Sequence, residues 1–267
     1  MNAQTSSVLS SPLPLPPMVR VLPAPAPVPV PAHDSPRLWQ PTFLVKRGLA
    51  RNLADVAERH FSIETTPRVL DVGCGSMPYR SLFEGRCRDY VGCDPFPQSS
   101  AVTRCTTEQL RFDDASFDAV VTFQVLEHTR HPWRMMAECA RVLKPGGLLV
   151  LSASFLLPHQ DAPCDYFRFT QEGLMELAND ADLAVEEFHA HCTAISTLVL
   201  LLNCQLQRMT SPLQRLAMTR PLGRLASFGM FVPLNLLGLA CETRPFRTPA
   251  DELNEGFANH LIVCRKG

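Results

Sequence analysis

The alternation of strand-like and helix-like segments constrains the fold of this chain most. Short apolar runs rich in β-branched residues, typical of buried strands, occur at 68–73, 90–94, 117–123 and 146–153. Helical segments such as "PWRMMAECARVL" lie between them. This order predicts a doubly wound α/β fold, a parallel sheet with helices on both faces. Ligands of such sheets bind beyond the carboxyl ends of the strands, so the residues that follow each strand form the candidate site.

The first predicted strand runs into the glycine-rich segment "DVGCGSMPYR". Gly73 and Gly75 permit a tight turn and a close approach of the backbone to a ligand, and Pro78 suits the first turn of a following helix. We therefore expect a cradle for a polar ligand at a helix N-terminus. A simple turn is the alternative interpretation, because proline at position 78 replaces the third glycine of the dinucleotide fingerprint.

An acidic residue ends the next predicted strand, "YVGCD", nineteen residues after Gly75. The carboxylate of Asp94 can accept hydrogen bonds from both hydroxyls of a ribose. The alternative is a solvated aspartate at a strand end. Pro95 and Phe96 follow at once, where they can pack against the face of an adenine.

With these segments in place, residues 68 to about 190 resemble the class I S-adenosylmethionine-dependent methyltransferases, above all a bacterial group with quinone-biosynthesis-like and polysaccharide-cluster members. "RVLDVGCG" is similar to the first motif of the family, "GCDP" to its ribose acid, and "EQLRFDDASFDAVVTFQVLEHTRHP" to its adenine loop and fourth strand. "RVLKPGGLLVLSAS" resembles the helix, turn and fifth strand that follow, and "HQDAPCDYFRFTQEGLMEL" a later segment of the polysaccharide-linked branch. The resemblance implies a Rossmann-like methyltransferase sheet with S-adenosylmethionine as cofactor.

The resemblance also implies a set of cofactor-binding residues at the strand ends and in the adenine loop. The expected set is Asp71, Gly73, Gly75, Asp94, Pro95, Thr106, Thr107 and Gln124. The glycine loop and Gln124 would hold the methionine end, and Asp94 the ribose. Relatives usually have an aspartate in the adenine loop, where this chain has Thr106 and Thr107. A threonine hydroxyl can still accept from the adenine amine, and Glu108 is an alternative partner.

Methyl transfer needs a general base only if the acceptor atom carries a proton. The segment after the fifth strand offers polar residues over the expected cofactor site, and His159 is the best candidate because its reference pKa lies near neutrality. The alternative is that His159 and Arg168 only hold this loop, through hydrogen bonds to Asp161 or Asp165.

Two histidine-containing segments, "LEHTRH" and "HAHC", could suggest a metal site, but no metal is expected. The ten cysteines include no C-x-x-C pair, which disfavours zinc and fits free thiols in a reduced compartment. We therefore expect a cytoplasmic chain. Asp118, at the start of a predicted strand, is expected to be structural.

The C-terminal third departs from the usual pattern of the family. "LAVEEFHAH" and "HLIVCRKG" match the expected antiparallel last pair of strands, but residues 193–256 intervene as an expected helical insertion. It contains two apolar stretches, the second interrupted by Pro233 and Asn235. Six arginines against Glu242 give residues 193–250 a local charge of +5. We expect this insertion to lie on the surface of an anionic membrane, at its inner face, without crossing it. The alternatives are a helical cap over the substrate pocket or a dimer contact.

Composition sets the remaining expectations. Eleven of the 24 prolines fall between Pro12 and Pro41, so residues 1–36 are predicted to be a disordered or polyproline II tail, with a docking tract as the alternative. The expected core spans 37–192, completed by a last strand in 257–267. A formal charge of −1 disfavours nucleic acid as a partner. The expected partner is a small or a lipid- or sugar-linked methyl acceptor, and the rival functions are a non-catalytic scaffold and an NAD-dependent oxidoreductase.

Overall fold

A computed structural model describes residues 20–21, 36–62, 64–97, 99–159, 164–216, 220–243 and 258–267. Its helices and strands follow in the order β1 (Arg20–Val21), α1 (Phe43–His60), β2 (Arg68–Val72), the 3-10 helix η1 (Arg80–Leu82), β3 (Asp89–Asp94), β4 (Val102–Arg104), β5 (Phe117–Phe123), the 3-10 helix η2 (Leu126–His128), α2 (Pro132–Val142), β6 (Leu143–Ser154), α3 (Gln171–Asn179), β7 (Leu183–His191), α4 (Ala194–Leu216), α5 (Arg220–Cys241) and β8 (Asn259–Lys266).

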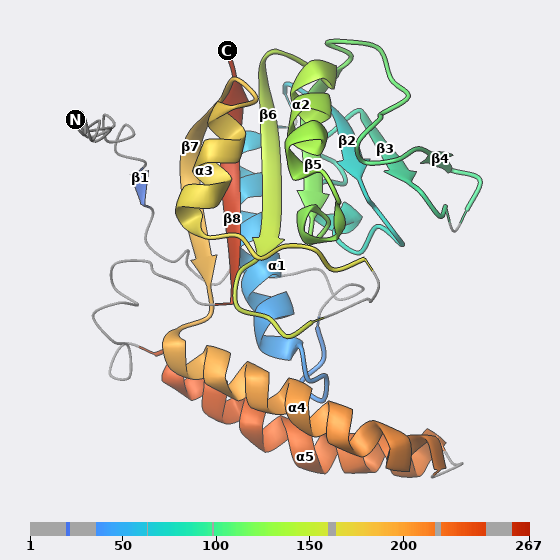
Figure 1. Ribbon diagram of the computed structural model, residues 1–267, viewed down its shortest axis with the longest axis vertical. Helices are drawn as coiled ribbons and strands as arrows, with labels where there is room; N and C mark the ends of the chain where they lie inside the picture. The colour runs from blue at the N-terminus through green and yellow to red at the C-terminus, as the bar shows by residue number, and fades with distance from the viewer. Residues whose placement is uncertain are drawn as a thin grey trace, which may run out of the picture.

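The strands form one sheet in the order β1-β7-β8-β6-β5-β2-β3-β4 (Figure 1). Neighbouring strands are parallel except for β8, which runs antiparallel to both β6 and β7. From β2 the chain winds outward to β3 and β4, and it then returns to β5 on the other side of β2. The strand order therefore reverses between β2 and β5, which marks the expected ligand crevice at their carboxyl ends. The predicted doubly wound sheet and the antiparallel last pair are confirmed.

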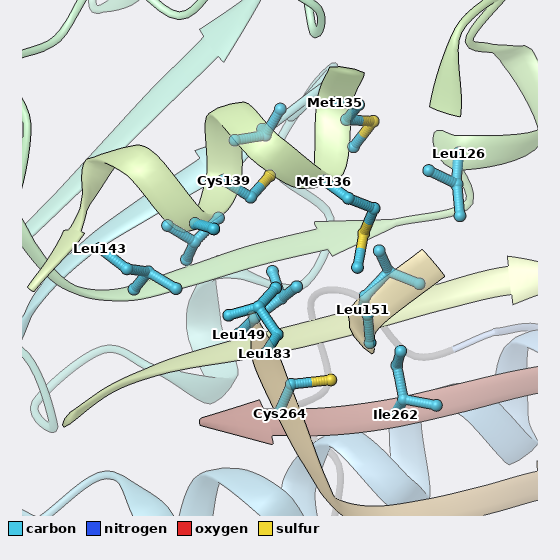
Figure 2. Packing of buried hydrophobic residues seen from close by; sticks show 14 of the residues in the cluster. Leu126, Met135, Met136, Cys139, Leu143, Leu149, Leu151, Leu183, Ile262 and Cys264 are labelled. Atoms are coloured by element: carbon cyan, nitrogen blue, oxygen red, sulfur yellow. The ribbon is translucent and has the colours of Figure 1, made fainter. Parts of the chain in front are cut away.

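Helices cover both faces of the sheet, and each face has its own apolar cluster. On one face Met136 of α2 packs in a cluster with Leu151 of β6 and Ile262 of β8 (Figure 2). On the other face Leu53 of α1 packs in a cluster with Val121 of β5. Because helices cover the sheet on both sides, the sequences of β5 and β6 are nearly continuous apolar runs rather than alternating apolar and polar residues.

The helix expected after the glycine-rich turn is wrong. The chain between β2 and β3 has a single 3-10 turn, η1, of three residues. Leu82, the last residue of this turn, and Phe83, directly after it, are buried, and Phe83 packs edge-on against Phe61 at the end of α1. The segment therefore anchors itself to the core before a full helical turn is complete. The loop after β2 cannot offer a helix dipole to a ligand, because no α-helix begins between β2 and β3.

Between β7 and β8, α4 and α5 form a helical hairpin that lies beyond the sheet (Figure 1). The second apolar stretch forms α5, which continues through Pro233. Proline removes one backbone hydrogen bond and crowds the carbonyl four residues earlier. That residue is Gly229, which like Pro233 lies on the exposed side of α5, where water can reach the freed carbonyl.

Buried asparagines fix the hairpin to the chain that precedes α1. Asn203 of α4 donates to Asn235 of α5 at 2.9 Å. The Nδ2 of Asn235 also donates to the carbonyls of Leu38 (2.7 Å) and Gln40 (3.0 Å). Asn235, the polar residue that interrupts the second apolar stretch, thus joins the hairpin to the rest of the fold.

Three further expectations concern the cysteines, a membrane-spanning helix and the proline-rich segment. All ten cysteines are free thiols. Within the part of the chain that the structure describes, no helix combines the length and the apolarity needed to cross a membrane. The proline-rich segment 1–36 lies almost wholly outside the described residues, but Arg20–Val21 within it form β1, which pairs in parallel with Glu187–Phe188 of β7.

Candidate functional site

The loop after β2 is closely packed at Gly73 and open at Gly75. Both glycines have positive φ, +69° and +50°. A Cβ atom at Gly73 would lie 2.6 Å from Cγ2 of Val125, so η2 leaves no room for a side chain there. At Gly75 nothing lies within 4 Å of the corresponding position. A ligand can therefore approach the backbone at Gly75, while Gly73 fixes the loop against the turn that follows β5.

Asp94, at the end of β3, is joined directly to this loop. Its Oδ2 accepts from the backbone N–H of Gly75 at 3.0 Å, and its Oδ1 accepts from the N–H of Phe96 at 2.8 Å. Two carboxylate oxygens offer about four acceptor positions, so capacity remains for two ligand hydroxyls. Pro95 is partly exposed, and the Phe96 side chain is 82% exposed beside it. The structure thus brings together two parts of the predicted site that are nineteen residues apart.

Asp71 is a buried carboxyl group at the end of β2. Its Oδ2 accepts a hydrogen bond of 2.8 Å from the hydroxyl of Tyr90. Burial raises the pKa of Asp71 to about 7, the nearby charge of Asp94 raises it further, and the Tyr90 hydrogen bond opposes the rise. A cation bound at these strand ends would favour the ionised form of Asp71.

The predicted adenine loop follows β4 and stays close to β3, because the N–H of Cys105 donates to the carbonyl of Asp94 at 3.3 Å. Thr106 is exposed, and the Thr107 hydroxyl lies 3.2 Å from that of Thr129. Glu108 accepts from the backbone N–H of His131 at 3.1 Å, and its other oxygen lies 2.8 Å from the ring Nδ1 of His131. Because Glu108 is engaged at the start of α2, the threonines are better placed than Glu108 to contact a base.

Gln124, directly after β5, has a φ of +59°, which is uncommon outside glycine and typical of functional sites. Its Nε2 donates to Ser152 at 3.2 Å. Its Oε1 lies 3.0 Å from the hydroxyl oxygen of Ser154 and accepts from Asn259 at 3.1 Å. The amide therefore connects the carboxyl ends of β5 and β6 with the start of β8.

Glu127 belongs to the same polar network, and sequence reasoning missed its role. The residue is 2% exposed, and its Oε1 accepts from the hydroxyl of Ser154. Its Oε2 is buried without a hydrogen-bond partner in the described part of the chain. Burial raises the pKa of Glu127, although the Ser154 hydrogen bond acts in the opposite direction. A buried carboxyl oxygen without a donor is costly, so it marks a place where a ligand donor would be stabilising.

The loop after β6 is held by Arg168. Its guanidinium forms a bidentate pair with Asp165 (2.5 and 2.8 Å) and donates to the carbonyls of Leu157 and Pro158, both at 3.0 Å. The loop-holding interpretation therefore describes Arg168, whereas Asp161 lies outside the described residues. His159 is exposed, and its carbonyl accepts from Arg208 of α4. No hydrogen bond or ion pair joins its ring to another predicted site residue among the described ones.

The candidate metal segments do not gather around one point. Each histidine side chain has its own partner: His128 the carbonyl of Cys164 (2.7 Å), His131 the carboxylate of Glu108 (2.8 Å), His189 that of Glu187 (2.9 Å) and His191 the amide of Asn52 (2.9 Å). Across the ranges that the structure describes, no three metal-binding side chains come together. Asp118 binds the N–H of Arg68 (2.9 Å) and Lys144 Nζ (2.7 Å), as a structural residue does.

Comparisons with known proteins identify the central part of this chain. Residues 70–151 match the family described as "Methyltransferase domain". An "Uncharacterized methyltransferase" of Mycobacterium sp. (strain JLS) is 38% identical over 102 residues, which cover 33% of this chain and 40% of that protein. A "Probable S-adenosylmethionine-dependent methyltransferase" of Mycolicibacterium smegmatis is 31% identical over 135 residues, covering 45% and 52%. The chain thus spans only about half or less of the length of these relatives.

Solved structures with the same fold cover most of the chain. A putative sarcosine dimethylglycine methyltransferase from Galdieria sulphuraria matches with a TM-score of 0.53 at 14% identity, over 80% of this chain and 84% of that one. The [4+2]-cyclase SpnF matches with a TM-score of 0.51 at 20% identity, over 81% and 80%. The fold is the Rossmann-like fold of class I methyltransferases. The part of the chain that matches the methyltransferase domain, residues 70–151, lies within this fold.

Proposed function

We propose that this protein transfers a methyl group from S-adenosylmethionine to a small or a lipid- or sugar-linked acceptor. The observation that carries the proposal is the hydrogen bond between Gly75 and Asp94, which joins the open glycine loop beside the strand-order reversal to a carboxylate at the end of β3. This site lies within the segment that matches the methyltransferase domain.

The residues present fit this cofactor. The open position at Gly75 admits a ligand beside the backbone, and Asp94 has free acceptor capacity for the two ribose hydroxyls. The partly exposed Pro95 and the exposed hydroxyl of Thr106 would border the adenine, with Thr107 beside them. When bound, S-adenosylmethionine supplies a methyl group on a sulfonium, which an acceptor can displace in line. The protein has mainly to orient the two reactants and exclude water, an effect worth ~7 to 11 kcal/mol.

Asp71 and Gln124 would hold the methionine end. The carboxyl of Asp71 is placed to complement a positive charge, and a bound cation would lower its pKa from about 7. The strained backbone of Gln124 is held by its amide contacts to Ser152 and Ser154, so it presents a fixed surface at the end of β5. Asp71 lies near the end of β2 and Gln124 directly follows β5, and these two strands flank the strand-order reversal, which supports the assignment of both residues to one ligand.

Glu127 is proposed as a positioning residue on the acceptor side. Its Oε2 lacks a donor, and its Oε1 is fixed by Ser154, so an acceptor that carries an N–H or O–H would supply the missing hydrogen bond. His159 remains the proposed general base for such an acceptor, because it lies on the loop that Arg168 holds beside Ser154.

Glu127→Gln should lower kcat/KM for the methyl acceptor about 10- to 150-fold, because the acceptor would lose a hydrogen bond to a charged group worth ~1.5 to 3 kcal/mol. Its affinity for S-adenosylmethionine should stay the same. Ser154 can still donate to the glutamine carbonyl, so the fold should be retained. Initial rates and a pH profile check this. Glu138→Gln on α2 is the matched control, and an equal loss in that variant would contradict the positioning role.

The proposed function itself is tested by titration calorimetry with S-adenosylmethionine and with NAD in separate experiments. We expect binding of S-adenosylmethionine with a Kd in the micromolar range, about −8 kcal/mol, and no heat with NAD. Mass spectrometry should then detect S-adenosylhomocysteine when candidate acceptors are added. Binding of NAD alone would favour an oxidoreductase. Cofactor binding with no product from small, lipid-linked or sugar-linked acceptors would favour a scaffold.

We also propose that the protein works at the periphery of a membrane, where a lipid-linked acceptor is available. The α4–α5 hairpin supports this proposal, because it exposes apolar side chains, contains arginines but no acidic residue, and contacts the loop after β6 through Arg208.

A further inference from the structure

The exposed face of α5 is entirely apolar in its described part. The residues that this face turns to solvent are Phe228, Gly229, Pro233, Leu236, Leu237 and Ala240. Leu236 and Leu237 are 51% and 54% exposed. Large apolar side chains that lie side by side on a surface indicate an interaction site.

The neighbouring helix α4 also exposes apolar side chains. Leu198, Leu202 and Met209 are exposed, and their spacings of four and seven residues place them on one side of the helix. The opposite side of the hairpin is packed against the fold. There Gly238 approaches Leu44 of α1 so closely that a Cβ atom would lie 2.6 Å from its Cδ1. The inner side of the hairpin is therefore packed against α1, and its outer side exposes apolar residues to solvent.

The charge of the hairpin indicates what covers this face. Residues 193–241 contain no Asp or Glu, but they contain Arg208, Arg215, Arg220 and Arg224. A second copy of the chain would bring the same positive segment against itself, because a two-fold interface uses the same surface twice. An anionic lipid surface instead complements both the apolar face and the arginines.

We propose that the outer face of the α4–α5 hairpin binds the surface of an anionic bilayer, with both helices lying in the interface. The hairpin lies at the end of the sheet toward which β6 points (Figure 1). Arg208 of α4 binds the carbonyl of His159, and Leu200 of α4 shares an apolar cluster with Leu157. The bound surface would thus lie beside the loop after β6. That this loop receives a lipid-linked acceptor rests on the proposed function, whereas membrane binding does not.

Co-sedimentation of the full chain with vesicles tests the proposal. Vesicles that contain phosphatidylglycerol should pellet the protein, and phosphatidylcholine vesicles should pellet much less of it. Arg220→Gln with Arg224→Gln should weaken partition about 30-fold, which corresponds to about 2 kcal/mol for two arginines. Leu236→Glu with Leu237→Glu should release the protein from both kinds of vesicle, since two apolar anchors are lost and two negative charges are added.

Matched controls change the same kinds of residue elsewhere. Arg111→Gln with Arg134→Gln removes two exposed arginines outside the hairpin, and Trp133→Glu changes an apolar residue that is 50% exposed on α2. These variants should pellet like the parent, and unchanged melting temperatures show that all variants are folded. Equal recovery with anionic vesicles, neutral vesicles and no vesicles overturns the proposal. So does an equal loss in the controls, or a dimer that only the Leu236 and Leu237 changes dissociate.

Discussion

Replacing Asp94 with alanine should weaken binding of S-adenosylmethionine about 10- to 150-fold, since hydrogen bonds to a charged group are worth about 1.5 to 3 kcal/mol. Two effects combine in this variant. The ribose hydroxyls lose their acceptor, and the N–H of Gly75 loses the oxygen that fixes the loop. Titration calorimetry at constant pH measures the change.

Asp89→Ala is the control for this prediction. Asp89 is at the opposite end of the same strand, where it pairs with Arg68 at 3.1 Å on the surface. Surface pairs of this kind contribute little, so affinity should be unchanged. If Asp94→Ala binds as tightly as the parent protein, the ribose assignment is wrong, and Asp94 serves only to shape the loop.

Gly73→Ala should lower the free energy of unfolding by about 2 to 5 kcal/mol. A non-glycine residue at positive φ costs about 1 to 2 kcal/mol, and forcing a methyl group into a packed site costs about 1 to 3 kcal/mol more. The methyl group would lie 2.6 Å from Val125, which leaves no space for adjustment without moving η2. Chemical denaturation followed by circular dichroism measures the loss.

The chain contains a matched control for the steric part of this effect. Gly85 has a φ of +77°, but nothing lies within 4 Å of the position of its Cβ. Gly85→Ala should therefore cost only the backbone strain, about 1 to 2 kcal/mol. Adding Val125→Ala to Gly73→Ala should recover part of the difference. If Gly73→Ala and Gly85→Ala are equally destabilised, contact with Val125 does not explain the need for glycine.

The elements with a strong local pattern were predictable from the sequence. β5 spans Phe117–Phe123, the same residues as the predicted strand, and α2 differs from its predicted helix by one residue. β5 is covered on both faces of the sheet, so it is a continuous apolar run, and α2 buries one face, so its apolar residues recur at helical spacing. The hydrogen bond between Gly75 and Asp94 also follows the prediction, because adjacent parallel strands end at the same edge of the sheet.

Elements that depend on distant contacts were not predictable. Local pattern suggested a helix after Pro78, but burial of Phe83 against Phe61 decides that segment. The role of Asn235 could not be predicted, because its partners, Leu38 and Gln40, lie almost 200 residues earlier. Likewise, Asn259 meets Gln124 only because β8 returns to the sheet beside β6. Tertiary contacts overrode local preference at each of these positions.

The position of β8 has a consequence for the order in which the chain can fold. β7 has no ladder with β6 and reaches the main sheet only through β8, which is synthesised after the whole hairpin. The part of the sheet formed by β2 to β6 can therefore assemble on the ribosome before β8, the strand that pairs with β7, has been synthesised. Closing a long connection costs little more than closing a short one, about 0.6 kcal/mol for each doubling of length. The segment between β7 and β8 is thus the place where this architecture can lengthen, or acquire a new surface, at the smallest thermodynamic penalty.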